Sequence, residues 1–76
     1  MREQLDQIRG WLKTTVRGSD VVGVNTPVGR SLVTLQTSEY QVGRYEYTVA
    51  VGNRHIKAID ADEVIAVLTG FLLAGQ

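Results

Sequence analysis

The chain has 76 residues, which predicts a single domain over residues 1–76. It has no cysteine and one histidine, which excludes disulfides, thiolate metal sites and imidazole-rich zinc sites, so no metal or other cofactor is expected. Eight Lys and Arg balance eight Asp and Glu, and this net charge of zero argues against a protein held to nucleic acid by bulk electrostatics and removes one barrier to self-association.

The first predicted element is an amphipathic helix over residues 2–17, because its apolar residues recur at helical intervals. The stripe consists of Leu5, Ile8, Leu12 and Thr15, widened by Trp11 and Val16. Gly18 is well placed to end the helix, since glycine readily adopts the left-handed conformation that follows a helix. Gly10 lies inside the helix at a cost of up to ~1 kcal/mol relative to alanine. Close packing by a neighbour is the one explanation that we can offer for it.

Beyond Gly18 the chain changes to the alternating pattern of β-strands. Pro27 and Gly29 predict a tight turn, since proline fixes φ and glycine permits positive φ. Residues 38–43 are expected to form a looser connection, and Gly52–Asn53 a two-residue hairpin loop. The four predicted strands cover residues 21–26, 31–37, 44–51 and 54–59.

The short loop at Gly52–Asn53 sets the register of the last predicted hairpin. One face of this hairpin is then apolar and turned to the core, with Tyr45 and Tyr47 on it, while the other face is mostly polar. A shift by one residue would mix the two faces, which supports this register. The predicted pairs are Val51–Arg54, Val49–Ile56, Tyr47–Ala58, Ala50–His55, Thr48–Lys57 and Glu46–Ile59.

The last predicted element is a second helix, with Asp60 as its N-cap and Glu63 completing a capping-box pattern. One broad apolar face of this helix should pack on the sheet. Its residues are Ala61, Val64, Ile65, Leu68, Phe71 and Leu72. The predicted fold is therefore an α+β domain of order α-β-β-β-β-α. It consists of an N-terminal helix, a four-stranded antiparallel β-meander and a C-terminal helix, with both helices packed on one face of the sheet.

The opposite side of the last helix carries no charged residue after Glu63. It presents a row of small residues flanked by Val67 and Leu73, and such a row allows another helix to approach closely. Three interpretations are open: the first helix of the same chain covers this side, another molecule covers it, or the C-terminal end of the helix is frayed. We favour a homodimer, because two-fold dimers are the commonest assembly. The predicted self-association residues are Ala66, Val67, Gly70, Leu73 and Ala74.

The one candidate for a catalytic base is His55, which stands next to the tip of the predicted hairpin. A histidine in this place is usually solvated, and no serine stands in a recognisable relation to it. No catalytic residues are therefore predicted, and an enzyme is not expected. An enzymatic interpretation would require a dimer cleft that brings His55 near a carboxylate of the other chain.

An alternative function is nucleic-acid binding through the polar face of the sheet. The candidate contacts, with phosphate or with another partner, are Arg44, Arg54, His55 and Lys57. The acids within residues 60–63 would repel phosphate at the start of the second helix, and Glu46 lies on the same polar face. An ordinary solvated face with charges of both signs explains these residues equally well.

Residues 1–10 lack the apolar segment of a signal peptide, and the uncharged run at the C-terminal end is too short to span a membrane. A cytoplasmic location without membrane association is therefore expected. The sequence predicts a small protein–protein interaction module that forms homodimers and acts as an adaptor, regulator or inhibitor of a larger protein. An accessory protein of a mobile element would have this character.

Overall fold

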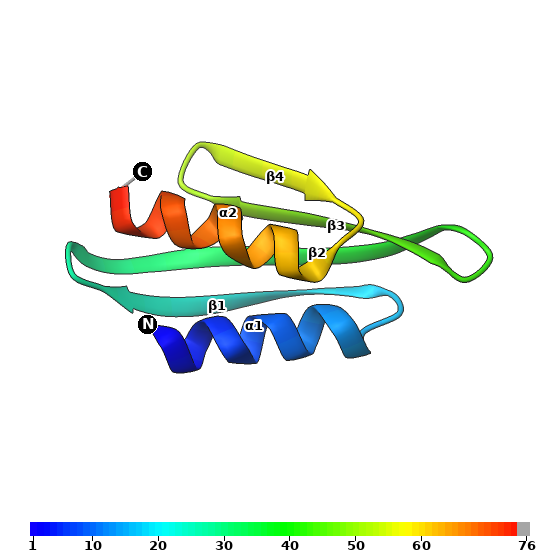
Figure 1. Cartoon of the computed structure of the whole chain (residues 1–76), viewed down its shortest axis with the longest axis horizontal. Coiled ribbons are helices and arrows are strands. Elements are labelled where there is room, and N and C mark those ends of the chain that lie inside the picture. Colours follow the sequence, from blue (N-terminus) through cyan, green and yellow to red (C-terminus); the bar gives the residue numbers. More distant parts are fainter. Residues whose placement is uncertain (75–76) are drawn as a thin grey trace.

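The computed structural model describes residues 1–74 as one antiparallel sheet with two helices on the same face (Figure 1). The elements are α1 (Arg2–Thr14), β1 (Gly18–Thr26), β2 (Gly29–Gln41), β3 (Arg44–Val51), β4 (Arg54–Ala58) and α2 (Ala61–Ala74). The strands lie in the order β1-β2-β3-β4. α1 packs on β1, α2 packs on β3 and β4, and the two helices contact each other. The predicted α-β-β-β-β-α fold is therefore confirmed.

The core fills the space between the sheet and the two helices. α1 contributes Leu5, Ile8 and Leu12 of its predicted stripe, with Trp11 partly buried, and the strands contribute the alternate residues of one face. The prediction that Val16 widens this stripe is wrong, because Val16 lies beyond α1 and is 55% exposed. α2 contributes its predicted inner face, of which Phe71 is partly buried and the other members are buried. The largest fully buried aliphatic side chains are Ile8, Leu12, Leu35, Leu68 and Leu72. No element of residues 1–74 covers the opposite face of the sheet, which we call the outer sheet face.

α1 ends at Thr14, earlier than predicted. Thr14, Thr15 and Val16 are β-branched in succession, and such residues lose side-chain freedom in a helix. Thr15 already has an extended backbone with φ −100° and ψ 118°, so Gly18 starts β1 and does not end the helix. The expected close neighbour of Gly10 is also wrong, because a Cβ built there meets no other part of the chain within 4 Å.

β2 and β3 extend beyond the other strands as a hairpin arm, defined by residues 38–46 (Figure 1). β1 begins opposite Thr37 and β4 ends opposite Tyr47, so the arm has no strand neighbour on either side. The predicted loose connection after Thr37 is wrong, because β2 continues to Gln41. A tight turn then leads into β3, with Gly43 at a φ of 75°.

The register of the β3–β4 hairpin agrees with the prediction at every pair that forms. Gly52 supplies the positive φ, 61°, that the two-residue loop requires. The predicted Glu46–Ile59 pair is wrong, because β4 ends at Ala58 and Ile59 lies in a bend that leads to α2. Glu46 therefore belongs to the arm and has no partner strand on the β4 side.

Ion pairs link α1 to the first turn of α2. Nε of Arg9 and Nζ of Lys13 lie 3.0 Å and 3.3 Å from Oδ1 of Asp62. The Arg9 contact is an ion pair by distance, but its angle is too bent for a hydrogen bond. Arg9 also pairs through Nη1 with Asp6, 3.0 Å away within α1. The three side chains that link the helices are 39–62% exposed, so each pair contributes at most about 1 kcal/mol and the apolar packing beneath them dominates.

α2 begins with the predicted N-cap, which is confirmed. Oδ1 of Asp60 accepts a hydrogen bond from the backbone N–H of Asp62 at 2.9 Å. The carbonyl oxygen of Asp60 accepts the first helical bond from Val64 at 3.1 Å. Asp62 and Glu63 lie in the first turn, where negative charge interacts favourably with the helix dipole.

β1 is an outer strand of the sheet, and side chains occupy two of its backbone N–H groups. The N–H of Val21 donates to Oδ1 of Asp20 at 2.8 Å. The N–H of Asn25 donates to Oε1 of Gln4, a residue of α1, at 3.3 Å. Both bonds use groups that would otherwise pair with a strand from another molecule. The free edge of β1 is therefore partly blocked.

Replacing Thr37 with valine should raise the free energy of unfolding by about 1 kcal/mol, because a buried hydroxyl without a partner carries an uncompensated desolvation cost. Thr37 is 1% exposed, and its Oγ1 has no hydrogen-bond partner within residues 1–74. Urea denaturation measures the change, with Thr34→Val on the outer sheet face as the exposed control. A loss of stability in Thr37→Val would contradict the assignment of an unpartnered hydroxyl.

Candidate functional site

The outer face of α2, defined by Ala66, Val67, Gly70, Leu73 and Ala74, is exposed at all five positions. Val67 is 39% and Leu73 is 54% exposed. A Cβ built on Gly70 would meet no other part of the chain within 4 Å. α1 therefore leaves this face open, and the interpretation in which α1 covers it is wrong.

This outer face has few charged or polar groups that can interact with water. No charged residue occurs in α2 after Glu63, and the last turn of the helix contains no basic residue. The hydroxyl of Thr69, at the margin, donates to the carbonyl oxygen of Ile65 at 2.7 Å. The face therefore combines apolar side chains with a shallow floor at Gly70, which suits contact with another apolar surface.

The four predicted basic contact residues do not form one surface. Arg54 turns to the helix side of the sheet, where its guanidinium lies 5.0 Å from the ring centroid of Phe71. His55 and Lys57 lie on the outer sheet face, and Nζ of Lys57 is 3.9 Å from Oε1 of Glu46. The expectation that Arg54 shares a face with His55 and Lys57 is therefore wrong. Arg44 lies apart from them at the hairpin arm.

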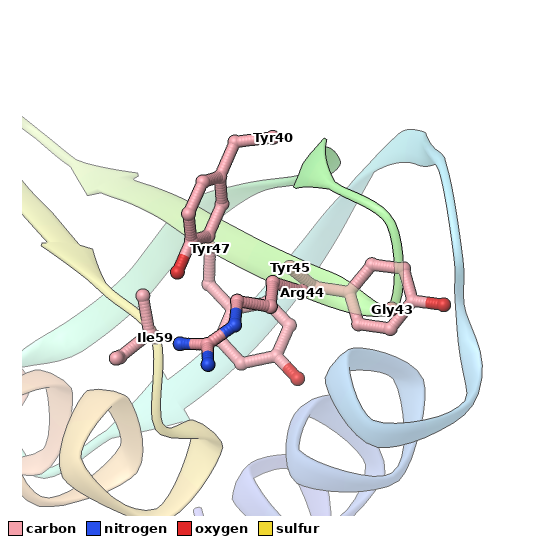
Figure 2. A pocket seen from close by; sticks show the side chains of 6 residues that line it. All are labelled: Tyr40, Gly43, Arg44, Tyr45, Tyr47 and Ile59. Atoms are coloured by element: carbon pink, nitrogen blue, oxygen red, sulfur yellow. The ribbon is translucent and has the colours of Figure 1, made fainter.

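Arg44 lines a pocket of about 240 Å³ along the hairpin arm. We call this the tyrosine pocket, because it gathers all three tyrosines of the chain. Its lining consists of Tyr40, Gly43, Arg44, Tyr45, Tyr47 and Ile59. In Figure 2 the hydroxyl of Tyr40 and the guanidinium of Arg44 both point toward the side where Ile59 lies. Side chains from β2, from β3 and from the bend before α2 therefore meet in this pocket.

Three local features of the backbone create the tyrosine pocket. A register shift between Glu39 and Gln41 marks an irregularity at Tyr40, and such bulges redirect side chains. β4 ends at Ala58, which leaves the edge of β3 open in front of the pocket. The chain then bends at Ile59 before α2 begins. The pocket is therefore accessible to solvent on this side, where Tyr40 is 49% and Ile59 is 64% exposed.

Sequence reasoning missed this pocket. The alternation of the last hairpin correctly places Tyr47 in the core, where it is 9% exposed, while Tyr45 is only partly buried. Tyr40 falls in the region predicted as a loose connection, and Ile59 in the predicted last strand. The available signal was the occurrence of all three tyrosines within residues 40–47.

The outer sheet face holds a second group of exposed apolar side chains. Val21 and Leu32 are 56% and 62% exposed, on adjacent strands. The guanidinium of Arg30 lies over Gly23, in the space that a Cβ at Gly23 would occupy. Arg30 therefore covers Gly23, while Val21 and Leu32 remain exposed.

His55 is exposed and stands opposite Ala50 in the β3–β4 ladder. Among residues 1–74, no group of three or more histidine, cysteine, aspartate and glutamate side chains is arranged to hold a metal ion. Neither helix of this part of the chain is long and apolar enough to cross a membrane.

Comparison with protein-family models, curated proteins and solved structures found no match to this chain. We therefore infer function from two surfaces of the described residues, the outer face of α2 and the tyrosine pocket. They are built from different residues, so substitutions can test each of them separately.

Proposed function

We propose that the protein is a small non-enzymatic interaction module that forms a homodimer through the outer face of α2 and regulates or connects a larger protein. One observation carries the proposal: α2 leaves Val67 and Leu73 exposed on a side without charge. A short domain has a thin margin of stability, and oligomerisation is a common way to raise it when disulfides and metals are lacking.

A second copy of the chain fits this face for reasons of charge and shape. In an antiparallel two-fold pair, the acidic first turn of each helix lies near the uncharged last turns of the other, so Asp62 and Glu63 of the two copies stay apart. The open space above Gly70 allows the helices to approach closely. Antiparallel helix dipoles also attract each other.

The size of the surface predicts a dimer of modest affinity. The outer face of α2 supplies a few hundred Å² per molecule, against about 800 Å² per partner in a standard interface. At ~25 cal/mol per Å² this burial stabilises by several kcal/mol before the cost of association. We therefore expect a dissociation constant in the micromolar range.

Sedimentation equilibrium of the wild type and of Gly70→Leu tests the dimer. The larger side chain should hold the helices apart and raise the dissociation constant at least about tenfold, which corresponds to ~1.4 kcal/mol. Gly10→Leu is the matched control, since Gly10 is also an exposed glycine inside a helix with open space above it. A wild type that stays monomeric at high micromolar concentration would contradict the proposal.

Nucleic-acid binding through the polar face of the sheet has less support. Arg54 is engaged with Phe71, and Lys57 lies near Glu46, so little unpaired positive charge gathers on that face. A gel-shift panel with single- and double-stranded DNA and RNA at low salt distinguishes the two functions. Binding that weakens steeply with salt would favour this alternative.

A further inference from the structure

We propose that the tyrosine pocket binds an extended peptide segment of a partner protein, and that a carboxylate of this segment pairs with Arg44. This site goes beyond the proposed dimer, because it uses the hairpin arm and none of the residues on the outer face of α2. The arm projects at the end of the molecule away from both labelled termini (Figure 1).

The backbone next to the pocket is open to strand addition. In an antiparallel sheet, alternate residues direct their backbone N–H and C=O groups to the same side. The two-residue loop makes Val51 and Arg54 a hydrogen-bonded pair, so every second residue before Val51 turns its backbone groups toward β4. Tyr45 belongs to this set, and its backbone groups point to the side where β4 would continue. β4 has ended at Ala58, and no strand pairs with Tyr45 on that side. An extended peptide can therefore add to the sheet at this position.

Arg44 supplies a positive charge that the chain leaves unused. No ion pair or hydrogen bond involves its guanidinium within residues 1–74. The two nearest acids along the arm are already engaged. Oε2 of Glu39 accepts from the N–H of Gly43 at 3.1 Å, and Glu46 lies near Lys57. Because guanidinium groups bind carboxylates in a fixed two-pronged geometry, a peptide carboxylate is the natural counter-charge.

The walls of the pocket suit an apolar side chain beside that carboxylate. Tyr40 and Ile59 are half-exposed or more, and Val42 at the tip of the arm is 100% exposed. Tyrosine and arginine are enriched among the residues that dominate protein–protein binding energies. A volume of about 240 Å³ is too small for a large ligand and has room for about one side chain. We therefore expect recognition of a short motif, an acidic group next to an apolar residue.

The charges around the pocket favour a peptide over a nucleic acid. Glu39 and Glu46 lie beside Tyr45 in the arm, and Asp60 follows Ile59 directly. A nucleic acid carries a phosphate at every nucleotide, so these acids would repel the phosphates that do not contact Arg44. A peptide with a single carboxylate avoids most of this repulsion.

Selection from a library of random octapeptides tests the proposal. One library presents the peptides with a free C-terminal carboxylate, and a second library presents them as C-terminal amides. Comparing the two shows whether the protein recognises the terminal carboxylate or the side chain of an aspartate or glutamate. The wild type should enrich peptides with an acidic group beside an apolar residue. Arg44→Gln should weaken binding of the selected peptides at least tenfold, and Arg2→Gln, an exposed arginine of α1, should leave it unchanged.

Hydrogen exchange of the Tyr45 backbone amide adds a readout of strand addition, and it should slow when a selected peptide binds. Failure to enrich any peptide family, or equal binding to Arg44→Gln, overturns the proposal. Binding of a poly-dT oligonucleotide that depends on Arg44, in place of peptide binding, also overturns it. Repeating the selection with Val67→Glu separates this result from dimer formation, since the outer face of α2 lies outside the pocket.

Discussion

Replacing Leu68 with alanine should lower the free energy of unfolding by about 2–5 kcal/mol, the cost of a cavity left by a large buried side chain. Leu68 is 0% exposed and lies at the centre of the inner face of α2. A domain of this length has a total stability of roughly 4–11 kcal/mol, at about 0.05–0.15 kcal/mol per residue. The substitution therefore removes a large part of it, and urea denaturation measures the loss.

Leu32→Ala is the matched control for this substitution, because it removes the same atoms from an exposed position. Leu32 is 62% exposed on the outer sheet face, where no helix packs. We expect a loss below about 1 kcal/mol there, as for most exposed substitutions. Equal losses of stability in the two variants would contradict the burial of Leu68 between α2 and the sheet.

Replacing Val67 with glutamate should raise the dissociation constant of the proposed homodimer at least about 100-fold, or ~2.7 kcal/mol. In the dimer the new carboxylate would lie against apolar helix surface without a counter-charge, which is costly. In the monomer it remains in water, because Val67 is 39% exposed. The fold should therefore persist while the dimer dissociates.

Thermal unfolding at several protein concentrations measures this effect. The Tm of the wild type should rise with concentration, since dimer formation stabilises the folded state by mass action. The Tm of Val67→Glu should not depend on concentration. Val16→Glu is the control, because Val16 is 55% exposed between α1 and β1 and lies outside the outer face of α2. A Tm of the wild type that is independent of concentration would contradict the proposed dimer.

The β3–β4 hairpin could be predicted from the sequence because local rules agree there. Gly52–Asn53 leaves a two-residue loop, and the alternation of Tyr47 and Val49 with polar residues defines one buried face. The same register places Arg54 opposite Val51, on the core side. Its separation from His55 thus follows from alternation, since neighbouring residues of a strand point to opposite faces.

The hairpin arm could not be predicted from hydrophobic pattern. Residues 38–41 are mostly polar, and the arm has no neighbouring strands, so no periodic apolar signal marks it. The end of β4 was equally hidden. Ile59 continues the apolar alternation of the strand, but Asp60 must cap α2, and this requirement bends the chain away from the sheet. The tyrosine pocket depends on both features and therefore escaped prediction.

The outer face of α2 was easier to find, because it depends on composition alone. A helix with apolar residues on all sides after Glu63 must leave some of them uncovered when one face packs on a sheet. From the sequence, either α1 or another molecule could cover the outer face of α2. The structure eliminates α1, because α1 contacts α2 and yet leaves Val67 and Leu73 exposed.

The two borders of the sheet differ, and this difference limits how copies of the protein can grow into larger assemblies. Gln4 and Asp20 occupy backbone donors along β1, whereas the opposite border beside Tyr45 stays open. Growth of a continuous sheet through many copies requires the open edge of one copy to pair with the β1 edge of the next copy. Because the edge of β1 is partly blocked, pairing of another strand along β1 is hindered, which works against fibre formation.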